Sequence, residues 1–368
     1  DICPEFSNGF RPRRGCTDAL FIFKQILRKR KEHGKDSWVL FLDIIKAFDK
    51  VDRGYLWEIL LLLGVPTPMV EVLQSLFVNR QAELNLDGET ATFAMNGGCG
   101  QGTILAPRLF SFFMYAVLQI WLARHPDALS CIQYLPDKMI TGRSYTTPGL
   151  RLMYSLFNVA DDTAIIFDNK DDVARLGFTL IRLLADFGLD THLSTPADTK
   201  PKTAVVHLSC RSRGHSETTS TDHAHLIPAD KDNKYHIYDL IPFAADYSTF
   251  VPVVRQYIYV GTCIHRSLED DTDIRRRIKS ATGIFGLLCK RVLRPKTTHR
   301  TVKKAIYEAN VLGLLLYGSE NWIVRKSTLR LLTSFHRRCV RTMNRVNLHT
   351  TELYSIRAQT LEARLGLS

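Results

Sequence analysis

Short apolar runs along the chain end at acidic residues. Residues 152–160 and 164–167 are two apolar runs rich in strand-forming residues, and they flank Asp161 and Asp162. Because Asp is a poor strand former, the pattern predicts a hairpin with both carboxylates at its tip. Adjacent like charges raise the free energy unless a cation lies between them and a partner. Alone, an Asp-Asp pair is more typical of a solvated turn, so a functional reading requires a partner elsewhere.

A second apolar run supplies a candidate partner. Residues 38–42 are apolar and predict a buried strand that ends at Asp43. A carboxylate at the end of a buried strand costs free energy unless it is paired, which favours Asp43 as the partner of Asp161. The alternative is that Asp43 caps a helix after the strand. Asp49 is expected to lie on a helical turn, where its carboxylate would pair with a nearby Lys or Arg.

The remaining pattern is mixed. The 3.6-residue period predicts helices, and alternation predicts strands, at the following positions: helices at 17–31, 56–63, 69–77, 107–122, 171–187, 273–288, 297–317 and 327–343; strands at 82–86, 90–95, 202–206 and 257–261. Residues 96–103 contain four glycines, so their backbone can approach a ligand closely, although the spacing is not that of a P-loop. Residues 209–229 are polar and predict an insertion or a mobile loop.

The distribution of charge along the chain indicates the kind of partner that it binds. The net charge is +12, and residues 275–345 contain 18 Lys and Arg but only two acids, Glu308 and Glu320. A basic segment beside a carboxylate-bearing one predicts a polyanionic partner, with nucleic acid as the first candidate. A merely basic surface is the alternative reading.

Composition excludes several classes. The eight cysteines contain no Cys-x-x-Cys pair, so neither a zinc site nor a disulfide scaffold is indicated, and a reducing compartment, cytosol or nucleus, is expected. No run approaches the ~18–20 apolar residues of a membrane span, so no membrane partner is expected. The chain starts without Met or a signal peptide, which suggests a piece of a longer protein.

In this order and spacing, the motifs resemble the reverse transcriptases of non-LTR (LINE-type) retrotransposons over nearly the whole chain. The motifs that carry the resemblance are Gly9-Phe10-Arg11 with Gly15-Cys16-Thr17-Asp18, Phe41-Leu42-Asp43 with Lys46-Ala47-Phe48-Asp49, Gln101-Gly102 with Pro107 and Leu109-Phe110, Ala160-Asp161-Asp162, Lys202-Thr203, Tyr259-Val260-Gly261 and Leu316-Tyr317-Gly318-Ser319-Glu320-Asn321-Trp322.

The resemblance implies an α+β, right-hand polymerase fold with an antiparallel palm sheet and a helical thumb. Fingers and palm would occupy residues 1–250, the primer grip and thumb 251–345, and the start of a truncated C-terminal region 346–368. The implied activity is RNA-directed DNA synthesis with an RNA template, a DNA primer and dNTPs, in the nucleus or cytoplasm. A flanking endonuclease is expected to lie outside this chain.

The resemblance also implies roles at the reaction centre. Asp43 and Asp161 would be the principal ligands of two Mg²⁺ ions, with Mn²⁺ as an alternative, and Asp162 would support them. Lys202 would donate a proton to the leaving pyrophosphate. Its register is open, because Lys200 lies two positions earlier.

Further roles concern the substrates. Phe48 would exclude a 2′-hydroxyl by its bulk, or be a core residue. Arg11 would contact the incoming triphosphate, and Gln101 and Gly102 the template and nascent base pair. The primer grip would contain Tyr257, Tyr259 and Gly261.

Some positions depart from the family pattern and leave alternatives open. Val159 stands where Tyr or Phe is usual, Gly100 where Arg is usual, and Ala106 where Ser is usual. A catalytically decayed relic that only binds nucleic acid and a group II intron-type maturase are the alternatives. The stretch at residues 316–322 favours the LINE type over the maturase, and Phe48 disfavours a viral RNA polymerase, which must accept a 2′-hydroxyl.

Overall fold

The computed structural model describes residues 9–10, 13–100, 102–128, 131–133, 151–153, 155–198, 200–210, 237–346 and 358–367. Arg11, Gln101 and most of the loop predicted at 209–229 lie outside these ranges. The chain divides into two compact units. Unit 1 comprises residues 1–260 and 266–268, and unit 2 comprises residues 261–265 and 269–368.

Unit 1 is built around a six-stranded sheet with the order β6-β7-β1-β8-β10-β9. All the neighbouring strands are antiparallel except β8 and β10, which are parallel. The strands are β1 (Ser37–Leu42), β6 (Leu156–Val159), β7 (Asp162–Phe167), β8 (Ala204–Leu208), β9 (Ile237–Pro242) and β10 (Phe250–Val254). The combination of this sheet with helices confirms the α+β class.

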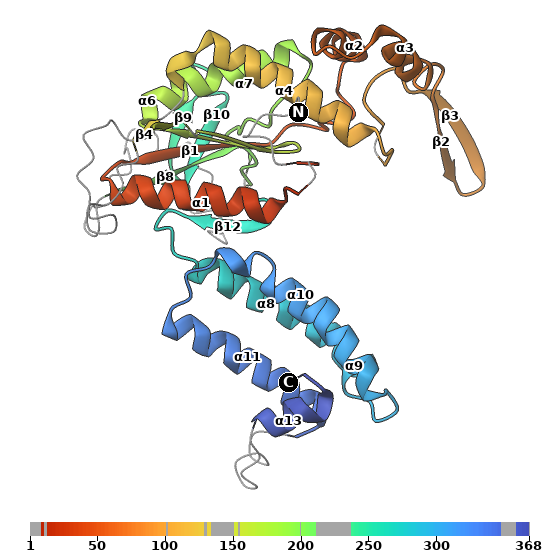
Figure 1. The fold of residues 1–368 in the computed structure, drawn as a ribbon, viewed down its shortest axis with the longest axis vertical. Helices are drawn as coiled ribbons and strands as arrows, with labels where there is room; N and C mark the ends of the chain where they lie inside the picture. The colour runs from red at the N-terminus through yellow and green to blue at the C-terminus, as the bar shows by residue number, and fades with distance from the viewer. Residues whose placement is uncertain are drawn as a thin grey trace. The chain divides into compact units, whose positions relative to one another are not determined.

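Helices cover both faces of the sheet (Figure 1). Those of unit 1 are α1 (Cys16–Glu32), α2 (Arg53–Leu62), α3 (Thr67–Ser75), α4 (Ala106–Arg124), α6 (Lys170–Asp172) and α7 (Phe178–Asp186). Successive side chains of a strand point to opposite faces, so β1 contributes side chains to the packing on both faces of the sheet. Leu40 and Leu42 join the core formed with α4 and α7, whereas Phe41 contacts Phe23 of α1.

Helix α4 is apolar enough, and long enough, to cross a membrane, and no other helix in the described part of the chain is. Half of its apolar window is buried inside the protein. Its residues Phe110, Phe113 and Trp121 are in the core of unit 1, which is ordinary for a central helix of a globular domain.

Smaller strands complete unit 1. The predicted hairpin at 82–95 is confirmed as β2 (Gln81–Leu86) and β3 (Glu89–Ala94). Asp87 and Gly88 at its turn have φ angles of 52° and 91°, as a two-residue hairpin turn of the I′ type requires. The other short strands are β4 (Cys131–Gln133), β5 (Arg151–Met153) and β11 (Gln256–Tyr259).

Three expectations about local structure are wrong. Asp43 caps no helix, because the chain after β1 continues into a bridge and turns. The strand predicted at 202–206 begins at Ala204, so Lys202 precedes it. Residues 237–254, for which the pattern predicts no strand, contribute β9 and β10 to the central sheet.

Unit 2 is mainly helical. Its elements are β12 (Thr262–His265), α8 (Asp271–Leu288), α9 (Arg300–Ile306), α10 (Gly313–Leu316), α11 (Lys326–Asn344) and α13 (Ala358–Leu365). The helix predicted at 297–317 is interrupted by a π-helical stretch, Tyr307–Leu312. An apolar core joins α8, α11 and α13 and contains Tyr307, Phe335 and Leu361.

Candidate active site

The register of the central sheet brings two acidic segments together. Strand β1 pairs with β7 up to Leu42 and Thr163, so Asp43 and Asp162 are the next residues along the two chains at this end of the sheet. Val159 of β6 faces Asp162, which leaves Ala160 and Asp161 as the hairpin turn. Ala160 has a φ of 60°, a left-handed conformation that a tight hairpin turn needs. The three Asp residues therefore lie at one end of adjacent strands.

A buried amide supports this turn. Asn158 donates from Nδ2 to the carbonyl oxygen of Ala160 at 2.9 Å and to Oγ1 of Thr163 at 3.0 Å. Because Asn158 is 3% exposed, losing these bonds would leave polar groups buried without partners. Sequence reasoning missed this role, since Asn158 was counted within an apolar run.

The carboxylates affect one another. Asp162 is exposed by its surface area, although the protein atoms packed near its carboxylate reduce that group's solvation. This desolvation, followed by the charges of Asp161 and Asp43, raises the pKa of Asp162 to about 6. Repulsion of this kind disfavours the ionised form and would be relieved by a cation at the hairpin tip.

Two cationic or ionisable side chains lie at Asp43. Nζ of Lys202 is 3.5 Å from Oδ2 of Asp43, and Nε2 of His192 is 3.8 Å from the same oxygen. Lys202 and His192 are themselves 3.0 Å apart. Among the described residues, Lys202 pairs with Asp43 and Lys200 does not. This favours Lys202 over Lys200 as the lysine that matches the motif.

His192 was missed by the sequence reading. Its backbone nitrogen donates to the carbonyl oxygen of Asp43 at 2.9 Å, next to a β-bridge between Ile44 and Thr191. The pairing joins segments about 150 positions apart, and no local motif marks His192. Thr203 was likewise given no role; its Oγ1 accepts a 3.2 Å hydrogen bond from the backbone nitrogen of Asp43.

The two tyrosines assigned to the primer grip lie in unit 1. Tyr257 stacks on Phe41 with ring centroids 4.4 Å apart, and its hydroxyl donates to the carbonyl oxygen of Lys202 at 2.5 Å. Tyr259 is 1% exposed and its hydroxyl donates to the carbonyl oxygen of Phe157 at 3.3 Å. Both tyrosines thus support strands that carry the acidic residues.

Gly261, the third residue of the expected primer grip, belongs to unit 2. It has a φ of 76°, and its carbonyl oxygen accepts hydrogen bonds at 2.5 Å from both Arg276 and Arg277. A Cβ there would lie 3.2 Å from the ring of Tyr317, which is tight. The motif at 316–322 therefore packs on the turn at Gly261.

Phe48 packs against the core of unit 1, as the alternative to its predicted role in sugar selection expects. Its half-buried ring stacks on Phe110 of α4 with centroids 4.5 Å apart. The glycine-rich loop is bonded to the backbone of Phe48: the backbone nitrogen of Cys99 donates to the carbonyl oxygen of Phe48 at 2.9 Å. A Cβ on Gly98 would lie 2.8 Å from the carbonyl oxygen of Asp49, so this approach needs glycine.

The glycine-rich loop is also held from α2. Arg53 donates to the carbonyl oxygens of Gly97 at 2.8 Å, Gly98 at 3.0 Å and Phe77 at 3.3 Å. Beyond this anchor, Gly102 is exposed with a φ of 83°, and a Cβ there would meet nothing within 4 Å. The loop is thus fixed at its start and open to solvent at Gly102.

No three His, Cys, Asp or Glu side chains within the described ranges are grouped closely enough to hold a metal ion as they stand. The site nevertheless fits Mg²⁺ in two respects. Mg²⁺ takes only one or two carboxylates when substrate phosphates complete its shell, so a three-residue cage is not required. Desolvation, followed by the charges of Asp161 and Asp43, raises the pKa of Asp162 to about 6, and a divalent cation beside these carboxylates would offset both effects.

Comparisons with known proteins agree with these observations. The model of the family described as "Reverse transcriptase (RNA-dependent DNA polymerase)" matches residues 1–194, just over half of the chain. That match includes Asp43, Asp161 and Asp162, and it ends before Lys202.

Two curated proteins are similar over shorter segments. The retrovirus-related Pol polyprotein from the type-2 retrotransposable element R2DM of Drosophila melanogaster is 31% identical over 112 residues, covering 30% of this chain and 11% of that protein. The Transposon TX1 uncharacterized 149 kDa protein of Xenopus laevis is 26% identical over 165 residues, covering 45% of this chain and 11% of that protein. The chain thus matches about a tenth of the length of each relative.

Among solved structures, telomerase from Candida albicans in complex with a fragment of telomeric RNA aligns with 96% of this chain and 54% of its own, at 8% identity and a TM-score of 0.37.

Proposed function

Because this chain belongs to the reverse transcriptase (RNA-dependent DNA polymerase) family, we propose that it copies an RNA template into DNA as the polymerase of a non-LTR retrotransposon. The reaction adds dNTPs to the 3′-hydroxyl of a DNA primer and releases pyrophosphate. The observation that carries the proposal is the β1–β7 register: its last pair is Leu42 and Thr163, so Asp43 and Asp162 follow at the same end of the sheet, beside the turn at Asp161.

Asp43 and Asp161 are the proposed ligands for two Mg²⁺ ions, with Asp162 in support and Mn²⁺ as an alternative. When bound, the ions would supply charge stabilisation for the attacking and leaving oxygens. The protein contributes a rigid position for the ligands: Asp43 follows a strand paired on both sides, and Asp161 lies on a turn held by Asn158.

Lys202 is the proposed proton donor to pyrophosphate. Its ammonium group already lies 3.5 Å from the carboxylate of Asp43, and the Tyr257 hydroxyl holds its backbone carbonyl. His192 is positioned to orient this ammonium, since its Nε2 lies 3.0 Å away. A lysine held at the reaction centre by two neighbours suits general acid catalysis, which depends on geometry before pKa.

The remaining site residues are proposed to contact substrates. Phe48 would restrict the 2′ position of the incoming nucleotide, Gln101 and Gly102 would contact the template and nascent pair, and Arg11 the triphosphate. The exposed backbone at Gly102 supports the proposed contact with the template and nascent pair. Tyr257, Tyr259 and Gly261 would form or support the primer grip.

We also propose the right-hand organisation for the fold. Unit 1 would contain the fingers and the palm, with the six-stranded sheet as the palm, and the helices of unit 2 would form the thumb. Support for this assignment comes from the position of Asp43 and the hairpin within the sheet and from the basic composition of the unit 2 helices.

The test is primer extension on an RNA template with Mg²⁺ and dNTPs. Asp43→Asn and Asp161→Asn should each reduce extension by on the order of 10³-fold, because each removes a charge worth several kcal/mol in the transition state. Asp186→Asn is the matched control, since Asp186 is exposed at the end of α7. Wild-type extension no greater than that of Asp43→Asn would refute the polymerase proposal and favour a relic that only binds nucleic acid.

A further inference from the structure

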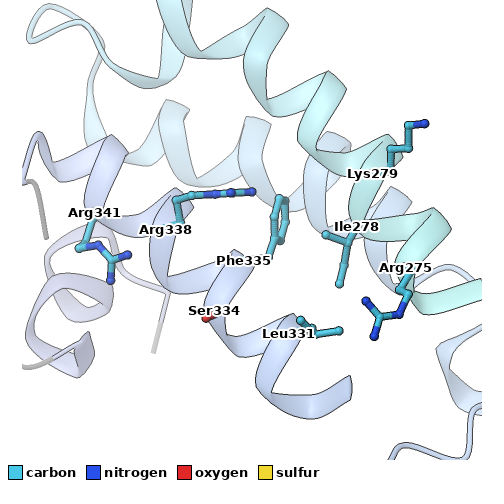
Figure 2. Close-up of a pocket in the computed structure, with 8 residues that line it drawn as sticks. All are labelled: Arg275, Ile278, Lys279, Leu331, Ser334, Phe335, Arg338 and Arg341. Carbon is cyan, nitrogen blue, oxygen red and sulfur yellow. The ribbon is translucent and has the colours of Figure 1, made fainter. Parts of the chain in front are cut away.

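A groove in unit 2 lies outside the site described above. It is formed between α8 and α11 and has a volume of about 480 Å³ (Figure 2). Its lining combines basic and apolar residues: Arg275, Ile278, Lys279, Leu331, Ser334, Phe335, Arg338 and Arg341. Pockets of roughly 300–1,000 Å³ enclose small organic groups, so this groove has room for one.

The rim of the groove carries unbalanced positive charge. Arg275, Lys279, Arg338 and Arg341 line it, and no acid does. Within the described ranges, none of these four side chains makes an ion pair, and the whole of α11 contains neither Asp nor Glu. Four cations without an acidic partner among the described residues favour a polyanion as the ligand.

The floor of the groove is apolar. Ile278, Leu331 and Phe335 come from the facing sides of the two helices, as Figure 2 shows. The guanidinium of Arg338 lies over the ring of Phe335, with Cζ 5.6 Å from the ring centroid. Because Arg338 covers the ring of Phe335, which is 3% exposed, the guanidinium plane itself is the stacking surface for a flat ring, beside the apolar side chains of Ile278 and Leu331.

We infer that this groove binds single-stranded nucleic acid, with a base on the apolar floor and phosphates on the cationic rim. A single strand exposes both base faces and phosphates, which matches both parts of the groove. A duplex hides its base faces, so the recessed apolar floor would stay unused. Acidic peptides match the rim alone. The inference goes beyond the proposed function, because such binding needs neither metal nor dNTP.

The test measures binding of a fluorescently labelled 12-nucleotide RNA to the full chain by anisotropy, in EDTA and without dNTPs. Arg338→Gln with Arg341→Gln should weaken binding about tenfold and reduce the magnitude of the salt slope by about 1.4, from two lost phosphate contacts. The matched control is Arg330→Gln with Arg337→Gln. It makes the same charge change at exposed positions of α11 that do not line the groove, and should weaken binding less than twofold.

Competitors separate the ligand classes. Unlabelled single-stranded RNA should displace the probe far better than polyphosphate, polyglutamate or an RNA–DNA duplex at equal charge. Equal losses in the two double variants would refute the inference, because binding would then follow net charge alone. Equal competition by polyphosphate, polyglutamate or the duplex would also refute it. Circular dichroism of each variant establishes that the helices are intact, and failure of primer extension would not affect either outcome.

Discussion

Gly9 and Ala160 are in backbone contact: a Cβ on Gly9 would lie 2.6 Å from the backbone nitrogen of Ala160. This contact sets the segment that precedes Arg11 against the turn that bears Asp161. Since real Cβ atoms do not approach backbone so closely, residue 9 must be glycine for the two segments to meet.

Gly9→Ala should therefore displace the hairpin turn. We expect a loss of about 1–3 kcal/mol in the free energy of unfolding, as for an overpacked site, and slower primer extension. Denaturant unfolding and extension assays measure the two effects. Gly283→Ala is the control, because a Cβ at this position of α8 meets nothing within 4 Å. It should stabilise the helix by about 0.5–1 kcal/mol. Unchanged stability and extension in Gly9→Ala would show that the contact is not maintained.

The pKa of Asp162 predicts a pH-dependent stability. Its folded-state pKa of about 6 is above the ordinary value of 3.8, so its contribution is most favourable below pH 3.8 and is lost as pH rises through 6. In EDTA, Asp162→Asn should raise the free energy of unfolding above pH 6 by on the order of 1 kcal/mol, after allowance for solvent exposure. Near pH 4 and below, the variant and wild type should converge. A constant difference across this range, measured by urea unfolding, would contradict the proposed repulsion.

The two lysines near the reaction centre should behave differently. Lys202→Met should lower kcat about 10²-fold and remove the basic limb of its pH profile, because the proposed general acid is lost. Lys200→Met should change kcat little, since the structure shows no pairing between Lys200 and Asp43. Single-turnover extension at several pH values provides the measurement. If both variants lose the same activity, a specific proton-donor role for Lys202 is wrong.

Phe48 should influence sugar selection and stability together. Phe48→Val should increase the use of rNTPs relative to dNTPs about tenfold, because bulk near the 2′ position is removed. It should also cost about 1–3 kcal/mol of stability, since the ring stacks on Phe110. Phe243→Val removes another half-buried ring, which packs on Phe178, and should cost stability without changing selectivity. Unaltered rNTP use in Phe48→Val would leave Phe48 with a packing role alone.

A buried acid should determine the stability of unit 2. Asp273 is 0% exposed and accepts hydrogen bonds from the backbone nitrogen of Cys263 at 3.0 Å, Arg276 at 2.7 Å and Trp322 at 3.1 Å. Asp273→Asn should destabilise unit 2 by about 3–5 kcal/mol, because it removes the buried negative charge that pairs with Arg276 and with the buried Arg277.

The milder variant Trp322→Phe should cost about 1.5–3 kcal/mol, because it removes one hydrogen bond to a charged group. Hydrogen exchange of α8, followed by mass spectrometry, should accelerate in both variants. Asp186→Asn, at the end of α7 in unit 1, should leave the exchange of α8 unchanged. Slow exchange of α8 in Asp273→Asn would show that the buried carboxylate is dispensable.

The acidic elements were predictable because their patterns are strong. The apolar run at 38–42 matches β1, and the predicted hairpin exists as β6 and β7. Its first strand is shorter than predicted, and Asp162 starts β7, so only Asp161 of the two acids lies in the turn. The resemblance to non-LTR reverse transcriptases is confirmed by the family match. Local periodicity sufficed for these elements, since each alternates or is continuously apolar over several residues.

Other features depend on tertiary contacts that sequence does not reveal. Strand β10 contains Pro252, a residue that argues against a strand, yet it lies between β8 and β9. His192 comes to Asp43 through a bridge between distant segments, and Asn158 supports a turn from within an apolar strand. These residues carry no periodic signal, so only the assembled sheet places them.

The position of β1 has a consequence for how the chain loses function over time. Strand β1 has β7 on one side and β8 on the other, so its amides exchange with solvent only when the sheet opens. Frayed ends and surface loops tolerate substitution far better than such a strand does. Among copies of the chain that accumulate substitutions, Asp43 should keep its position at the end of β1 as long as the domain folds. Substitutions in exposed loops are tolerated by the fold, so they should accumulate first and should be the first to reduce activity.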